Sequence, residues 1–114
     1  MEIKTEDYSI WYDSVTETTI FQGSLRLSGM EEYAPIVKLL NDLVDSEPPK
    51  ITLNLRELEF LNSSGINVLS KFVINVRQKE SMQMIVQGSK NIPWQSKSLK
   101  NLQRLMPSLQ LELA

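Results

Sequence analysis

The sequence predicts an α/β domain with a mixed β-sheet of about five strands and helices mainly on one face. Short stretches rich in β-branched and aromatic residues alternate with longer stretches whose apolar residues recur at helical spacing. The resulting order, β-β-α-β-α-β-α-β, implies crossover connections and an at least partly parallel sheet. Several strands alternate apolar with polar residues, whereas strands covered on both faces are apolar throughout. We therefore expect one face of the sheet to be half exposed to water.

Two strands precede the first helix. Residues 8–13 (YSIWYD) are rich in aromatic and β-branched side chains, which favours a strand. After a turn, residues 18–27 (TTIFQGSLRL) place Phe21 and Leu25 on one face and polar residues on the other. Gly23 lies inside this second strand and predicts a bulge or a close backbone approach.

The first helix is predicted to follow Ser28 and to end before Pro48. Ser28 and Glu31 have the spacing of a capping box, in which each side chain bonds the backbone amide of the other residue. Pro35 falls early, so we expect a distorted start. The expected buried face is an apolar stripe at helical spacing, formed by Met30, Tyr33, Ile36, Val37, Leu40, Leu43 and Val44.

Strands and helices alternate through the second half of the chain. The predicted elements are the strand 51–55 (ITLNL), the helix 62–80, the strand 82–87 (MQMIVQ), the helix 94–106 and the strand 109–113 (LQLEL). Pro93 fits the first turn of the last helix. The buried faces of the two helices are expected to be Ile66, Leu69, Phe72, Val73 and Val76, and Leu99, Leu102, Leu105 and Met106.

The composition of the chain excludes several kinds of catalytic and metal-binding site. A chain of 114 residues suits one domain spanning residues 1–114. The absence of cysteine and histidine excludes disulfides, Ser-His or Cys-His catalysis and the usual zinc sites. A net charge of −2 provides no excess of positive charge that would attract nucleic acid or an anionic membrane. With no signal-peptide pattern and no apolar run near the roughly 20 residues of a membrane helix, we expect a cytoplasmic non-enzyme without cofactor or metal.

Other features have ordinary structural interpretations. Glu57 and Glu59 follow the strand 51–55, and we interpret them as a solvated face rather than an acid-base pair. The stretch QGSK (87–90) lacks the earlier glycine of a phosphate-binding loop and predicts a strand-ending turn. Trp94 is expected to pack against the core.

The stretch NSSG lies where a predicted strand leads into the second helix. Asn62 is expected to cap this helix, and Ser63 could also do so. The first turn leaves backbone amides unpaired and favours negative charge, so a phosphate on Ser63 or Ser64 would be tolerated. Gly65 keeps the turn slim, which would let another protein approach the backbone. The residues alone favour a plain cap, whereas the position at the carboxyl end of a strand favours a functional site.

A possible docking strip follows the same helix. At about 100° per residue, Ser63, Asn67, Lys71 and Ile74 lie away from its buried stripe. An isoleucine beside polar residues on an exposed face is compatible with docking of another protein.

Residues 51–72 (ITLNLRELEFLNSSGINVLSKF) resemble the STAS domain, shared by anti-sigma factor antagonists and sulphate transporters. In that family an apolar strand leads into D-S-S-G-apolar-G-V-L and then a helix. Residues 23–27 (GSLRL) also resemble the family's glycine-leucine segment before its first helix. The resemblance implies a STAS-like sheet with helices mainly on one side. Asn62 stands where the family has Asp, and Asn67 stands in place of the second glycine.

The resemblance also implies a function. In antagonists of this family the first serine of the pair is phosphorylated by a kinase that doubles as an anti-sigma factor. This serine matches Ser63, with Ser64 as the second choice. The implied protein is a bacterial, non-enzymatic regulator of transcription, with an anti-sigma factor or serine kinase-like protein and a phosphatase as partners. The expected partner-binding residues are Asn62, Ser63, Ser64, Gly65, Asn67, Lys71 and Ile74.

The sequence is also compatible with two alternative functions. One is an interaction subunit with the same fold that binds constitutively, without phosphorylation. The other is a small nucleotide- or anion-binding domain that uses the turn at residues 62–66.

Overall fold

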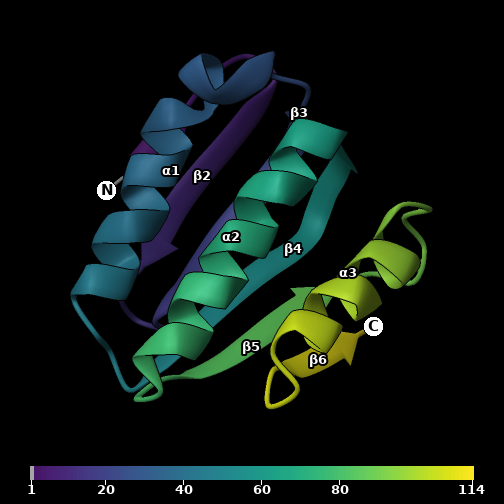
Figure 1. The fold of residues 1–114 in the computed structure, drawn as a ribbon. Coiled ribbons are helices and arrows are strands. Elements are labelled where there is room, and N and C mark those ends of the chain that lie inside the picture. Colours follow the sequence, from purple (N-terminus) through teal and green to yellow (C-terminus); the bar gives the residue numbers. More distant parts are fainter. Residues whose placement is uncertain (1) are drawn as a thin grey trace.

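Three helices cover one face of a six-stranded sheet in the computed structural model, which describes residues 2–114 (Figure 1). The strands are β1 (Glu2–Lys4), β2 (Tyr8–Asp13), β3 (Thr18–Leu25), β4 (Lys50–Leu61), β5 (Gln83–Gly88) and β6 (Gln110–Leu113). The helices are α1 (Gly29–Asp45), α2 (Ser63–Lys79) and α3 (Gln95–Leu105). The predicted mixed sheet with helices on one face is therefore confirmed, with six strands rather than five because β1 pairs with β2 at the edge.

The strands lie side by side in the order in which they occur along the chain. Strands β1, β2 and β3 are antiparallel neighbours, whereas β3, β4, β5 and β6 are parallel neighbours. Each parallel step is connected by one helix, so all three helices return over the same face of the sheet. The carboxyl ends of the parallel strands consequently share one edge, and α2 begins at that edge.

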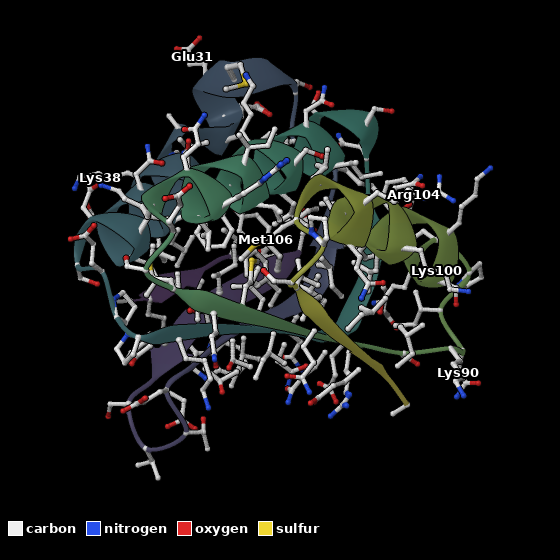
Figure 2. The ribbon with its side chains drawn as sticks, turned by 60° about the horizontal axis from the view of Figure 1, so that its bottom comes forward. Glu31, Lys38, Lys90, Lys100, Arg104 and Met106 are labelled. Carbon is white, nitrogen blue, oxygen red and sulfur yellow. The ribbon has the colours of Figure 1, made fainter. Side chains whose placement is uncertain are left out.

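The hydrophobic core fills the space between this helical layer and the sheet. Figure 2 shows side chains packed between the two layers, with Met106 directed into that space. Ile10 and Phe21, paired across β2 and β3, are buried from the sheet side. From the helix side, α2 buries Gly65, Val68, Leu69, Phe72, Val73 and Val76. Four residues that were predicted to be buried are only partly so: Val37, Leu43, Ile66 and Leu105.

The start of α1 differs from the prediction. Ser28 is the N-cap residue, but its side chain makes no capping bond, so the predicted capping box with Glu31 is wrong. Instead, the Ser28 amide donates to Glu32 Oε1 at 2.7 Å, and Gly29 adopts a left-handed φ of 64°. Met30, which was assigned to the buried stripe, is 53% exposed.

Strand β4 is longer than predicted because two bulges change its periodicity. Ile20 of β3 pairs with Asn54, but Gln22 pairs with Glu57, so β4 holds an extra residue there. A second shift follows between the pairs made by Gly23 and Ser24. The buried leucines consequently change from a spacing of two to a spacing of three, at Leu53, Leu55, Leu58 and Leu61. Glu57 and Glu59 are therefore exposed strand residues rather than loop residues.

The predicted close approach at Gly23 is confirmed. Gly23 has φ 98°, and a Cβ atom there would collide with the backbone of Asp7 and lie 2.9 Å from Tyr8 Cα. The adjacent Ser24 amide donates to Asp7 O at 2.9 Å. Only glycine fits this contact without moving the chain.

Side chains from α3 take the place of a strand beside the second half of β4. Strand β5 pairs with β4 only as far as Asn54. Beyond that point, Gln95 Nε2 donates to Leu55 O at 2.6 Å and to Leu58 O at 3.0 Å, and Trp94 Nε1 also donates to Leu58 O at 3.0 Å. Gln95 is fully buried, and its Oε1 accepts from the Ser89 amide at 2.7 Å. These bonds stabilise the segment of β4 that leads into α2.

Candidate functional site

The N-terminus of α2 is fixed by the side chain of Asn62. Its Oδ1 accepts from the Gly65 amide at 2.9 Å, as expected of an N-cap, and also from the Tyr33 hydroxyl at 2.7 Å. Its Nδ2 donates to Leu27 O at 2.8 Å. Asn62 therefore joins α2 to α1 and to the segment between β3 and α1. The predicted cap is confirmed, and the two further bonds use the donor and acceptor ends of the amide together.

Gly65 faces inward rather than toward a potential partner. A Cβ atom at this position would collide with the Leu61 side chain and lie 2.7 Å from the Tyr33 hydroxyl oxygen. The residue is buried, so its glycine identity is explained by the close packing of α2 on α1. It leaves no side-chain surface for docking.

Ser63 is exposed in the first turn of α2, whereas Ser64 is half-buried. The Gly65 amide is bonded to Asn62 Oδ1 and the Ile66 amide to Asn62 O. Within residues 2–114, the Ser63 and Ser64 amides have no such acceptor. The first turn contains no acidic residue, so the positive end of the helix dipole is not neutralised by its own sequence.

An exposed cation lies close to this helix start. Leu25 pairs with Leu61, and the Asn62 amide donates to Leu25 O at 3.2 Å, so Arg26 follows directly beside Asn62. The Arg26 guanidinium lies 4.6 Å from the centroid of the Phe60 ring, which is 38% exposed. Arg26 follows the buried Leu25 and Phe60 precedes the buried Leu61, so these two side chains lie on the face of the sheet away from the helices.

The exposed face of α2 continues from Ser63 through Asn67, Lys71 and Ile74, all of which are exposed as the helical spacing predicted. Beside this strip, a groove runs between α1 and α2. It is lined by Met30, Val37, Leu40, Asn41, Val68, Lys71, Phe72 and Asn75. Lys71 belongs to both features, so the predicted strip borders a largely apolar depression.

Two tyrosines lie under the site and have perturbed acidity. Burial raises the pKa of Tyr33 above its ordinary value of 10.0. Burial is also the main cause of the raised pKa of Tyr8, with the nearby charge of Glu32 as a smaller cause. The Tyr33 hydroxyl is neutral at physiological pH, as it would be at its ordinary pKa, and donates to Asn62 Oδ1.

The side chain of Asn62 holds the start of α2 in place through three hydrogen bonds. In the part of the chain that the structure describes, no three metal-ligating side chains come together. Over the same residues, none of the helices combines the length and apolar character needed to cross a membrane. The Asn62 side-chain amide is occupied in holding the backbone, whereas within residues 2–114 the hydroxyls and backbone amides of Ser63 and Ser64 are not.

The sequence did not indicate that three residues, Tyr33, Gln95 and Leu27, support the site through hydrogen bonds. Tyr33 was assigned only to the apolar stripe of α1, and its hydroxyl was the signal that a polar partner would be needed. Gln95 and Leu27 act through tertiary hydrogen bonds that carry no local pattern. Trp94 is half-buried against the core, as expected, and its indole N–H braces β4.

Comparison with known proteins identifies the fold. No family model matches the chain, and neither does the sequence of any curated protein. Among solved structures, SiaC from Pseudomonas aeruginosa, the activator of the diguanylate cyclase SiaD, is similar with a TM-score of 0.72 and 13% identity. The match covers 100% of this chain and 99% of SiaC. An anti-sigma factor antagonist from Mycobacterium paratuberculosis gives a TM-score of 0.66 and 18% identity, over 94% of this chain and 88% of the antagonist. The predicted STAS-like fold is thereby confirmed.

Proposed function

We propose that this chain is a non-enzymatic regulatory protein of the anti-sigma factor antagonist type, which acts by binding another protein. Binding would use the start and the exposed face of α2, and phosphorylation of Ser63 would end it. The observation that carries this proposal is the exposed Ser63 at a rigidly capped helix start, within a fold shared with an antagonist and an activator. Both of those proteins are named for their action on another protein.

The proposed partners follow from the antagonist type. They are a serine kinase-like anti-sigma factor, which binds and phosphorylates the chain, and a phosphatase that restores the unmodified form. The process served would be regulation of bacterial transcription. The activity of SiaC on a cyclase shows that the fold also serves partners outside transcription, so the protein-binding role is the broader part of the proposal.

A phosphate on Ser63 would alter binding more than folding. It would add about −1.5 to −2 charges at neutral pH. The free first-turn amides and the helix dipole both favour negative charge at this place. A partner that covers Ser63, however, would have to remove a dianion from water, which is unfavourable unless the partner supplies a matching cation.

The docking surface would combine polar and apolar contacts. Asn67 and Lys71 supply exposed polar groups on α2, and Ile74 supplies an apolar side chain that is 37% exposed. Met30 and Phe72 line the adjacent groove, which could receive an apolar side chain of the partner. A few such buried anchors normally account for most of the affinity of an interface.

The first experiment identifies the partner and measures its affinity. Pull-down from the native host followed by mass spectrometry supplies the partner, and calorimetry compares the wild type with Ser63→Asp and Ser63→Asn. We expect Ser63→Asp to weaken binding at least about tenfold, because a buried uncompensated charge costs several kcal/mol. Ser63→Asn, similar in size but neutral, should bind much more tightly than Ser63→Asp.

A matched pair of charge changes tests the location of the surface. Asn67→Glu lies on the proposed strip, whereas Gln110→Glu adds the same charge at an exposed position of the edge strand β6. Only Asn67→Glu should weaken binding. Equal affinity of the wild type and Ser63→Asp would refute the switch. An unmodified intact mass of protein purified from its own cells, with and without active kinase, would favour constitutive binding instead.

A further inference from the structure

The nearly even overall charge conceals a separation of charges along the chain. Residues 1–70 contain 12 acidic and five basic side chains, whereas residues 71–114 contain two acidic and seven basic side chains. In the fold, α1 and α3 lie on opposite sides of α2 within one layer (Figure 1). Figure 2 shows Glu31 and Lys38 on the α1 side and Lys90, Lys100 and Arg104 on the α3 side. One end of the helical layer is therefore acidic and the other is basic.

The solvent face of α3 carries cations without ionic partners. Lys97, Lys100 and Arg104 are all exposed, and their spacing of three and four residues places them on one face of the helix. Across residues 2–114, the ion pairs join Lys38 to Asp42 and Lys79 to Glu47, and neither involves α3. These three side chains, together with Arg77, are referred to below as the α3 basic surface.

Arg77 connects this surface to α2. Its Nη1 donates to Leu105 O at 3.0 Å, at the end of α3. Arg104 contacts Asn101 Oδ1 at 3.4 Å, a neutral neighbour that leaves its charge in place. Arg77 and Arg104 therefore lie near the same end of α3, and the cations of α3 are not neutralised by carboxylates of their own helix, which contains none.

The α3 basic surface lacks the features that insert into membranes or stack on bases. Leu99 and Leu102 of α3 point into the core, and its exposed positions are polar or cationic. The Trp94 ring is half-buried and its indole N–H is bonded to Leu58 O. Membrane-surface helices need an exposed apolar face, and single-stranded nucleic acids need exposed aromatic rings for stacking.

The acidic end of the same layer disfavours extended anions. A membrane surface or a nucleic acid duplex laid across the helices would also meet α1, which exposes Glu31, Glu32 and Asp45. Its Asp42 is paired with Lys38 at 3.0 Å. A short anionic chain that contacts α3 alone avoids this repulsion, since surface charges are screened within about 8 Å at physiological ionic strength.

We propose that the α3 basic surface binds an acidic segment of a partner protein. The contact lies on a different helix from the Ser63 site and requires no phosphorylation, so it goes beyond the proposed function. It would speed association and set the orientation of the partner, which is what complementary charges at the border of an interface chiefly do.

The test measures binding of a fluorescent oligoglutamate peptide by anisotropy at low and at physiological ionic strength. The wild type is expected to bind the peptide, more weakly as salt is added. The triple variant Lys97→Gln, Lys100→Gln, Arg104→Gln should bind on the order of tenfold more weakly, because three exposed charge contacts are removed. Far-ultraviolet circular dichroism and thermal unfolding of this variant check that it folds.

The control variant Lys4→Gln, Lys38→Gln, Lys50→Gln removes the same charge from exposed positions away from α3. It should change peptide binding by less than about twofold. Equal weakening by both variants, or absence of binding by the wild type, would overturn the proposal. So would tighter binding of duplex DNA or anionic vesicles than of the peptide. Sedimentation that detects self-association of the wild type, abolished in the α3 variant, would instead assign the surface to a second copy of the chain.

Discussion

Asn62 and Tyr33 form the hydrogen bond that ties the start of α2 to α1, and a double-mutant cycle measures how much it contributes. Asn62→Ala removes a helix cap, which costs about 1 kcal/mol. It also leaves the Tyr33 hydroxyl, on a side chain that is 1% exposed, without its acceptor, which costs about 1–3 kcal/mol more. Asn62→Ala also removes the bond from Nδ2 to Leu27 O, which contributes about 1 kcal/mol. We therefore expect this variant to lower the free energy of unfolding by about 3–5 kcal/mol.

The second mutation separates the cost of leaving the Tyr33 hydroxyl without an acceptor from the cost of losing the helix cap. Tyr33→Phe removes one hydrogen bond and leaves Asn62 Oδ1 bonded to the Gly65 amide, so we expect a loss of about 1 kcal/mol. In the double variant no hydroxyl remains without an acceptor, and the loss should be about 3 kcal/mol, from the cap, the bond to Leu27 O and the bond to Tyr33. The double variant is thus expected to be about 1–3 kcal/mol more stable than the sum of the two single losses predicts.

Urea unfolding followed by tryptophan fluorescence supplies the free energies, provided that the m values of the four proteins agree. Asn75→Ala, at an exposed position of the same helix, serves as the control and should change stability by at most about 0.5 kcal/mol. Additive losses from Asn62→Ala and Tyr33→Phe, within about 0.5 kcal/mol, would refute the assignment of this bond.

Asn62→Asp tests the donor end of the same amide. An aspartate keeps the acceptor for the Gly65 amide and the Tyr33 hydroxyl, but its ionised carboxylate would face Leu27 O, which now accepts from Nδ2 at 2.8 Å. We expect a loss of about 1 kcal/mol at neutral pH. The loss should shrink at pH values below about 4, because the protonated carboxyl can donate again. A stability equal to that of the wild type at neutral pH would contradict this role of Nδ2.

Three further predictions concern stability. Gln95→Leu should lower the free energy of unfolding by about 2–4 kcal/mol in urea, since the carbonyls of Leu55 and Leu58 lose a buried donor; a loss below 0.5 kcal/mol would exclude the bracing role. Gly65→Ala should lower the free energy of unfolding by about 1–3 kcal/mol, because the added methyl group overpacks the contact between α2 and α1. The thermal unfolding midpoint should fall accordingly, and an unchanged midpoint would show that α1 and α2 move apart without cost. The pKa of Tyr33 is raised in the folded chain, so its contribution to the free energy of unfolding is present below pH 10.0 and is lost as the pH rises through the pKa of the folded state. Tyr33→Phe should therefore reduce the loss of stability at alkaline pH. The same slope of stability against pH in the variant and the wild type would contradict this prediction.

The sequence predicted the elements whose periodicity is regular. The alternation of strand 51–55 and the helical spacing of α2 gave the correct faces, and the good cap at Asn62 gave the correct helix start. The prediction of β4 stopped at Leu55 because bulges change the leucine spacing from two to three. A bulge depends on the partner strand, so the run from Leu55 to Leu61 had no local pattern to indicate a strand.

The features of the site that were not predicted depend on distant parts of the chain. Asn62 meets Tyr33 and Leu27, which lie 29 and 35 residues earlier in the chain. Gln95 reaches Leu55 across 40 residues. Each of these bonds exists only after the sheet has brought the segments together, and a glutamine or tyrosine within an apolar stripe does not indicate which partner it will meet. The basic face of α3 could have been predicted, because its charges are local in sequence.

The start of α2 and the end of the α3 basic surface at Arg77 are far enough apart to act separately on one partner. Ser63 begins α2, and Arg77 lies 14 residues later near its end, which corresponds to about 21 Å along a helix axis. This is more than twice the screening length of about 8 Å at physiological ionic strength. A phosphate on Ser63 would therefore oppose docking at the start of α2 while leaving attraction to the end near Arg77 and Arg104 almost unchanged. A partner held by its acidic segment would remain at high effective concentration after release from α2, so dephosphorylation could restore binding without a new diffusional encounter.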